Sequence, residues 1–365
     1  MFVLSQCLVL SLLLSAEAGT RAAEQVGLIE LHEALDHAVM SKIYAEDPDS
    51  MYVTLRGGGL SVFDVSDPSA PRLRSRWSEP VDVEGQDRRG DLLVVVERTG
   101  ALRTFDVSDP DAPTPIGRVT LEVDRGAYRW FRERLMTRLG SGPFGALHTK
   151  LYDADDGHRY ALVTATSTGE LIAVDVTDPT QPTQVGAVQT GVRFIEGIYI
   201  HRDHAFVGGF GSDRLAVVEV SRPTELRLVE TLEDSRYRQM VSEMSPAHPE
   251  LLFTALWGDE GGLAIFDVHT PAQATPIGVL ALPELRRSNR VKLSGTDALL
   301  PLEDHPGGFA VVDVSDPTRP SLSLLEVGID GISAPYTLEV CGDYLYLFGS
   351  TAPRMAVFRL YESKP

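Results

Sequence analysis

Short apolar stretches separated by turn residues recur along this chain, with the spacing of β-strands. Val81-Asp82-Val83 alternates, residues 92–96 form a continuous apolar run, and residues 101–107 lead into a polar turn. Alternation with a period of two indicates a half-buried strand, and a short apolar run bounded by turn residues is typical of a buried one. With a fourth strand over residues 116–121, this stretch predicts one four-stranded antiparallel sheet.

A six-residue motif marks the end of the third strand in each predicted sheet. Its copies are Phe63-Asp64-Val65-Ser66-Asp67-Pro68, Phe105-Asp106-Val107-Ser108-Asp109-Pro110, Val174-Asp175-Val176-Thr177-Asp178-Pro179, Val218-Glu219-Val220-Ser221-Arg222-Pro223, Phe266-Asp267-Val268-His269-Thr270-Pro271 and Val312-Asp313-Val314-Ser315-Asp316-Pro317. Proline ends the strand because it cannot donate to the ladder, and Asp and Ser side chains bond nearby backbone amides in a turn. A repeat of roughly 40 to 50 residues with four strands in each unit is typical of β-propeller blades.

The terminal copy, residues 358–361, lacks the turn and completes the count of blades at seven. It supplies three strands, over residues 337–340, 344–348 and 355–360, but no fourth. Residues 26–31 resemble the fourth-strand pattern of residues 116–121, so we expect them to close the ring and cover its open strand edge. The sequence therefore predicts an all-β fold: a single seven-bladed β-propeller over residues 26–361, closed by an N-terminal strand.

The recurring Val-Asp-Val-Ser-Asp-Pro copies, each followed by an apolar strand, resemble the LVIVD repeat family of secreted or surface propeller-like proteins. The resemblance covers most of residues 26–361. It implies the architecture and a location outside the cytoplasm, but it brings no catalytic residues with it. The chain departs from the pattern in its fourth copy, which has Glu219 and Arg222 in place of aspartates, and in its fifth, which has His269-Thr270.

The net charge of the chain restricts the classes of partner, and its first 18 residues indicate where the protein is located. A net charge of -19 argues against nucleic acid or anionic lipid as a partner, since both attract surplus Lys and Arg. Residues 1–18 form an apolar run that ends in small residues, as in a secretory signal peptide, although no Lys or Arg precedes the run. We expect a monomeric, exported protein, periplasmic, secreted or on the cell surface, without a transmembrane span in the mature chain. The alternative is an uncleaved anchor helix.

The step from the second to the third motif copy is about 25 residues longer than the others, which predicts an insertion between blades 2 and 3. Within it Phe131, Leu135 and Leu139 recur every four residues, as on one face of a helix over residues 125–140. This helix would bind a partner or cover the channel as a lid through Arg125, Arg129, Trp130, Arg132, Arg134 and Arg138. Alternatively, it packs its apolar face on the propeller and pairs its arginines with surface carboxylates.

Propeller topology indicates where a ligand would bind. The loops between second and third strands and those between blades lie on the face opposite the motif turns, around the mouth of the central channel. The inner strands are expected to begin near residues such as His37 and Glu79. The polar residues predicted to converge at the channel mouth are His148, Glu196, Glu243, Arg290, His305 and Tyr336. Since water fills most propeller channels, simple solvation of these residues is the alternative.

Two functional hypotheses from different classes follow. The first is a binding or interaction scaffold that uses the channel face bearing the inserted helix, with a protein or small-molecule ligand and no cofactor. No Gly-x-Ser-x-Gly, His-Glu-x-x-His or nucleotide-binding motif is present. The second is a hydrolase or lyase at the channel mouth, where carboxylates and histidines would act as acid and base or hold a divalent metal. The enzyme hypothesis requires these side chains to converge on one point.

Overall fold

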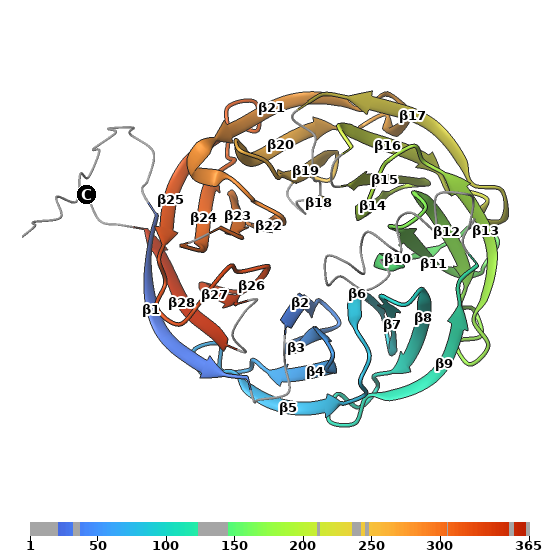
Figure 1. The fold of residues 1–365 in the computed structure, drawn as a ribbon, viewed down its shortest axis with the longest axis horizontal. Helices are drawn as coiled ribbons and strands as arrows, with labels where there is room; N and C mark the ends of the chain where they lie inside the picture. Colours follow the sequence, from blue (N-terminus) through green and yellow to red (C-terminus); the bar gives the residue numbers. More distant parts are fainter. Residues whose placement is uncertain are drawn as a thin grey trace, which may run out of the picture.

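Seven four-stranded antiparallel sheets are arranged in a ring in the computed structural model (Figure 1). The structure describes residues 21–31, 37–122, 145–209, 212–235, 242–244, 248–304, 306–349 and 354–362. In blades 1 to 6 the strands follow one another in chain order from the central axis outward. The architecture is the predicted all-β, seven-bladed propeller.

The first three blades comprise β2 (His37–Tyr44), β3 (Asp47–Arg56), β4 (Gly59–Asp64) and β5 (Arg72–Trp77); β6 (Val83–Arg89), β7 (Leu92–Glu97), β8 (Ala101–Asp106) and β9 (Thr114–Thr120); and β10 (Ala146–Asp153), β11 (Arg159–Ala165), β12 (Glu170–Asp175) and β13 (Thr183–Gln189). The fourth and fifth comprise β14 (Ile195–His201), β15 (His204–Gly209), β16 (Arg214–Glu219) and β17 (Arg227–Glu233); and β18 (Ser242–Met244), β19 (Leu251–Leu256), β20 (Gly261–Asp267) and β21 (Thr275–Leu282). The sixth and seventh comprise β22 (Lys292–Ser294), β23 (Asp297–Leu302), β24 (Gly308–Asp313) and β25 (Ser321–Val327); and β26 (Thr337–Cys341), β27 (Tyr344–Phe348), β28 (Arg354–Glu362) and β1 (Arg21–Glu30).

Blade 7 is assembled from segments far apart in the sequence. Strand β1 pairs antiparallel with β28, with Ile29 opposite Met355, and forms the outer strand of that sheet (Figure 1). The strand begins at Arg21, earlier than the predicted residues 26–31. A β-bulge between Gln25 and Gly27 interrupts the pairing. The ladder satisfies backbone groups of β28 that would otherwise form an exposed strand edge.

Two sequence predictions, the signal peptide over residues 1–18 and the helix over residues 125–140, lie outside the described residues. The described part contains three short 3-10 turns, η1 (Pro223–Glu225), η2 (Pro271–Gln273) and η3 (Pro283–Leu285), and no α-helix. None of its helices has the length and apolar character needed to cross a membrane.

The repeated motif forms the predicted turn by local hydrogen bonding. The Asp64 carboxylate accepts a hydrogen bond from the Ser66 backbone amide at 2.9 Å, and Asp175 accepts one from Thr177 at 2.8 Å. The valine between them in each full copy is buried, because it points into the blade while its neighbours face solvent. The Asp-Val-Ser sequence is therefore a structural turn, with one side chain that anchors the turn and one that joins the core.

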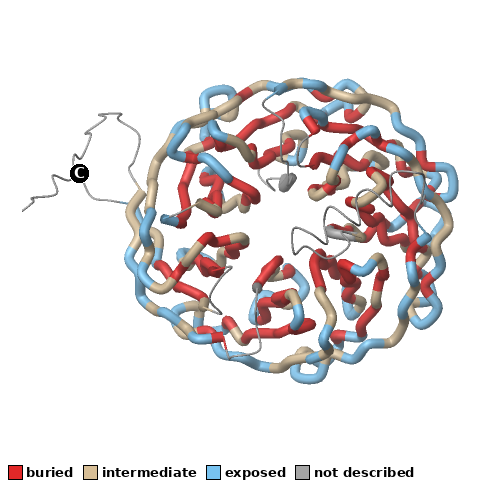
Figure 2. Tube along the Cα trace, viewed as in Figure 1, coloured by how far each residue is buried: buried red, intermediate tan, exposed pale blue. Residues whose placement is uncertain are grey.

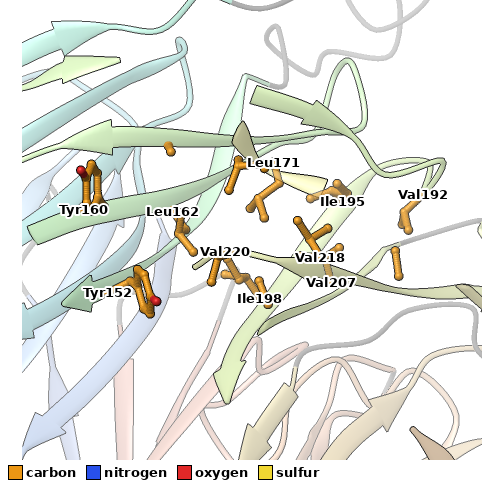
Figure 3. Packing of buried hydrophobic residues seen from close by; sticks show 14 of the residues in the cluster. Tyr152, Tyr160, Leu162, Leu171, Val192, Ile195, Ile198, Val207, Val218 and Val220 are labelled. Atoms are coloured by element: carbon orange, nitrogen blue, oxygen red, sulfur yellow. The ribbon is translucent and has the colours of Figure 1, made fainter. Parts of the chain in front are cut away.

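The hydrophobic core is divided into clusters that lie between neighbouring blades. Figure 3 shows one of them, in which Leu162 and Leu171 of blade 3 pack with Val207 and Val218 of blade 4. Figure 2 shows that buried residues concentrate in the second and third strands of the blades, while the outer strands are partly exposed. Each blade thus buries its apolar surface against the next one around the ring.

A close backbone contact repeats between blades at a glycine of the outer strand. A Cβ atom added to Gly186 of blade 3 would lie 2.2 Å from the Pro223 carbonyl oxygen of blade 4. An added Cβ at Gly117 would lie 2.3 Å from the Pro179 carbonyl oxygen in the same way. The motif proline of one blade therefore sets how closely the preceding blade approaches, and only glycine fits there.

Candidate functional site

The inner strands begin, and the second strands end, at the face of the ring opposite the motif turns. Around the central axis this face brings together residues at the end of β3, the starts of β6 and β14, the segments before β22 and β26, and the turns after β7 and β23. We call the group formed by Arg56, Glu84, Arg98, Glu196, Arg290, Glu303 and Tyr336 the channel mouth.

One side of the channel mouth is an ion-paired cluster between blades 1 and 2. The Arg56 guanidinium donates to Glu84 from Nε to Oε1 at 2.7 Å and from Nη2 to Oε2 at 3.3 Å. Arg98 Nη1 lies 3.5 Å from Glu84 Oε1. The Glu84 side chain is 2% exposed. A buried carboxylate held by two arginines fixes the orientation of both guanidinium groups.

Tyr336 lies between two of these cations. The Cζ atoms of Arg56 and Arg290 are 5.6 Å and 5.1 Å from the centroid of its ring, distances at which a cation is attracted to an aromatic face. Burial and the nearby Glu196 carboxylate raise the pKa of the Tyr336 hydroxyl, so it stays protonated and can donate a hydrogen bond. The tyrosine therefore joins the Arg56 side of the channel mouth to the Arg290 side.

Glu196 is the titrating group of the channel mouth. Burial raises its pKa to about 7, and the carboxylates of Glu84 and Glu303 add to the increase, while Arg290 and Arg56 oppose it. The pKa of Glu303 is also raised, mainly by burial, although Asn289 Nδ2 donates a hydrogen bond to it at 3.2 Å. A carboxyl with a pKa near neutrality can exchange a proton with a bound molecule.

Arg290 connects the channel mouth to the interior. Its side chain is mostly buried, and among the described residues its Nε atom has no hydrogen-bond partner. Deeper along the axis, His148 is buried beside Arg290, Lys150 and Lys42, and burial together with these cations holds the pKa of His148 well below its usual value. His148 is therefore neutral at neutral pH.

Of the predicted channel-mouth residues, the structure brings Glu196, Arg290 and Tyr336 together, and it places His148 one step further in, within the electrostatic reach of Arg290. Glu243 lies in β18, but its side chain is outside the described residues, as are His305 and the six residues of the predicted helix.

The predicted strand start near Glu79 was wrong, because β6 begins at Val83. Glu84 therefore occupies the position at the mouth, while Glu79 is partly exposed and pairs with Arg103 at 3.4 Å. Sequence analysis also missed Arg56. Its signal was its position directly before Gly57-Gly58-Gly59 at the turn between second and third strands, which matches Arg98 before Thr99-Gly100 in the next blade.

The flanks of the inserted segment are fixed at this same face. The backbone amide of Leu121 donates to the Gly100 carbonyl at 2.8 Å, and that of Gly145 donates to the Arg98 carbonyl at 2.8 Å. A Cβ atom on Gly145 would lie 2.6 Å from the Arg98 carbonyl oxygen. The chain therefore leaves blade 2 and enters blade 3 beside a residue of the channel mouth.

A hollow of about 470 Å³ lies on the same face at blade 4, lined by residues that include Arg193, Asp213, Arg214 and Glu233. Arg214 Nε lies 2.8 Å from Glu233 Oε1, and both side chains are exposed. Its charges are paired in solvent, unlike the buried charges of the channel mouth. Among the described residues, no three His, Cys, Asp or Glu side chains gather in a way that could hold a metal ion.

Comparison with known proteins identifies the repeat and the fold. The LVIVD repeat model matches residues 49–78, 159–190 and 303–325, which contain parts of blades 1, 3 and 6. No curated protein matches the sequence.

Several solved structures share the architecture. A chain in the crystal structure of the mitotic checkpoint complex is 10% identical, with a TM-score of 0.69, and the match covers 99% of both chains. The Cps50 (Swd1) β-propeller domain of Myceliophteria thermophila is 12% identical, with a TM-score of 0.67 over 93% of this chain and 99% of that one. A proposed 6-phosphogluconolactonase from Bacteroides fragilis is 13% identical, with a TM-score of 0.57 over 81% and 85%. At these identities the likeness establishes the fold alone.

Proposed function

Starting from a chain that is an LVIVD-repeat β-propeller, we propose that it is a binding protein that takes its ligand at the channel mouth. The observation that carries the proposal is the concentration of buried charge around Tyr336. Glu84 is almost fully buried, Arg290 is mostly buried, and burial raises the pKa of Glu196 to about 7. At the other end of the ring, the hydrogen bonds of the motif turns at Asp64 and Asp175 are exposed to solvent.

The energetic cost of this arrangement supports a functional role. Removing an ion from water costs roughly several kcal/mol, and replacing buried ion pairs with apolar side chains is often neutral or stabilising. A propeller selected for stability alone would gain by placing apolar residues at these positions. Perturbed titrating groups that share a concave site are typical of binding and catalytic sites.

The inserted segment and the N-terminus complete the proposal. Since the flanks of residues 123–144 are bonded at the mouth, the basic residues of that segment are available to cover or extend the ligand site. Residues 1–18 direct export, so the ligand is met outside the cytoplasm. Mass spectrometry of the protein recovered from the cell envelope or the medium tests export, because cleavage after Ala18 would lower its molecular mass by that of the first 18 residues.

The binding function is tested by a thermal-shift screen of the purified protein against neutral sugars and polyols, amines, amino acids and organic acids. A true ligand raises the melting temperature in a saturable way, since binding to the native state stabilises it. The shift should be lost in Tyr336→Ala, which removes the ring between the two arginines, and retained in Tyr361→Ala, which removes an exposed tyrosine of β28. A shift of equal size in both variants would contradict binding at the channel mouth.

One observation favours a second function, a hydrolase or lyase at the same site. Glu196 has a pKa near neutrality and lies in one electrostatic network with Arg290 and Tyr336, so it would act as a general base while the other two stabilise developing negative charge. A proposed 6-phosphogluconolactonase shares the fold, which makes lactones reasonable first substrates to test. Turnover of a lactone or ester that disappears in Glu196→Gln, with the melting temperature retained, would favour catalysis over binding.

A further inference from the structure

Beside the channel mouth, a buried amide side chain is only partly hydrogen-bonded. Asn289 is the only asparagine of the chain, and it lies between β21 and β22 with 1% of its surface exposed. Its Nδ2 donates to Glu303 Oε2 at 3.2 Å, but among the described residues its Oδ1 accepts no hydrogen bond. A buried amide oxygen without a donor is costly unless water or a ligand supplies one.

Arg290, the next residue, has the complementary need. It is 8% exposed, and its Nε atom finds no hydrogen-bond acceptor in the part of the chain that the structure describes. Its charge, in contrast, is balanced, because Arg290 interacts electrostatically with the carboxyl groups of Glu196 and Glu303. Arg290 therefore needs a hydrogen-bond acceptor rather than a further negative charge.

The other described cations of the channel mouth are also balanced by carboxylates. Arg56 and Arg98 share the buried carboxylate of Glu84, at 2.7 Å and 3.5 Å. An anion that entered here would be repelled by this carboxylate and by those near Arg290, while a cation would be repelled by the guanidinium groups. The charges of the described residues thus favour a neutral ligand.

The backbone that leads to the channel mouth is strained at three positions. Four described residues other than glycine have a positive φ, and three of them lie just before strands that begin at this face. These three are Phe194 at 48°, Arg287 at 61° and Ala334 at 43°. They precede, by two or three residues, Glu196, Arg290 and Tyr336. Strain of this kind is typical of sites whose geometry is fixed for function, and a fixed site loses less entropy on binding.

Hydroxyl groups satisfy both unbonded atoms without adding charge. A hydroxyl accepts hydrogen bonds and donates one, so neighbouring hydroxyls of one molecule can accept from Arg290 Nε and donate to Asn289 Oδ1. The partly exposed Tyr336 offers a protonated hydroxyl as a further donor, and the oxygens of Glu303 offer further acceptors. A rigid ring that carries several hydroxyl groups matches this mixture of donors and acceptors.

We propose that the channel mouth binds a neutral sugar, whose hydroxyl groups satisfy Arg290 Nε and Asn289 Oδ1. This inference rests on the proposed function, because it names the chemical class of the ligand that enters there. Occupation of these atoms by water alone is the alternative, and it predicts no saturable binding of sugars.

The test is calorimetric titration of the purified full chain with D-glucose, D-galactose and D-mannose, each compared with its uronate at neutral pH and constant ionic strength. We expect saturable binding of at least one hexose, and weaker binding of its uronate, which keeps the ring but adds a negative charge. Arg290→Lys keeps the positive charge but lacks the Nε donor, and Asn289→Leu removes the Oδ1 acceptor, so each should weaken binding of the hexose about tenfold. Arg72→Lys, on the exposed outer strand β5, is the matched control and should bind as the unchanged protein does.

A second measurement needs no substitution at the site. Because the chain has one asparagine, selective ¹⁵N labelling of asparagine gives a single side-chain amide signal, that of Asn289, and this signal should shift along the same saturation curve as the heat. Four results would each overturn the inference: no saturable binding of any hexose, tighter binding of the uronates, an unshifted Asn289 signal at saturation, or unchanged affinity in both variants. If another compound binds through Tyr336 while all three hexoses fail, the proposed function stands without the sugar site.

Discussion

Because the pKa of Glu196 is raised, we expect the protein to lose stability as the pH rises, and we expect the Glu196→Gln variant to lack this loss. Burial lifts the pKa of this carboxyl from its usual 4.5 to about 7 in the folded protein. Between these values the folded state holds the proton more tightly than the unfolded state, so the free energy of unfolding falls as pH rises. At about 1.4 kcal/mol for each tenfold difference in proton affinity, the total loss is at most about 3 kcal/mol, and it is complete above the folded pKa.

Glu196→Gln removes this titration while keeping the size and shape of the side chain. Relative to the unchanged protein, the variant should gain up to about 3 kcal/mol of stability on going from pH 5 to pH 8. Urea unfolding of both proteins at the two pH values, followed by tryptophan fluorescence and circular dichroism, measures the difference in midpoints.

The matched control is Glu24→Gln, which makes the same chemical change on the exposed outer strand β1. The reasoning is refuted if Glu196→Gln shifts the urea midpoint equally at pH 5 and pH 8. A stabilisation found only at pH 5 would also refute it, because it reverses the sign of the expected linkage.

Three further predictions concern the frame that holds the channel mouth. Gly186→Ala should cost about 1–3 kcal/mol, measured by urea unfolding, because its Cβ would meet the Pro223 carbonyl at 2.2 Å, whereas Gly27→Ala has only ordinary contacts and should cost less. Leu162→Ala, in the fully buried core between blades 3 and 4, should cost about 2–5 kcal/mol in the same assay. Deletion of residues 21–30 should uncover β28 and cause association visible by light scattering; a deleted protein that stays monomeric with an unchanged melting temperature would contradict closure by β1.

The fold could be predicted largely from the sequence because its determinants are local and repeated. Each Asp-Val-Ser turn is made by a side chain and a backbone amide two residues apart, as in Asp64 and Ser66, so the motif can be recognised without knowing what packs on it. The terminal strands were found for the same reason, as a repeat with three strands instead of four. The predicted boundaries of these strands were less accurate, because the N-terminal strand that completes blade 7 begins at Arg21 rather than at residue 26.

The site was predicted only in part, because its residues share no local signal. Glu196, Arg290 and Tyr336 were chosen from topology, as residues near the starts of inner strands, and they do lie in one electrostatic network. Arg56 was missed because the candidates were chosen mainly at the starts of inner strands, whereas it ends a second strand. Glu84 was missed because the start of β6 was placed near Glu79.

What the sequence determined by itself was the period, and with it the number of blades, the position of the turns and the face on which the channel opens. These follow from interactions that span a few residues and recur in each repeat. Only the tertiary structure decided which charges become neighbours. Arg56, Glu196, Arg290 and Tyr336 come from four different blades, so they become neighbours only after the ring has closed. The cost or benefit of a charge depends on burial and on its neighbours, and both are properties of the assembled ring.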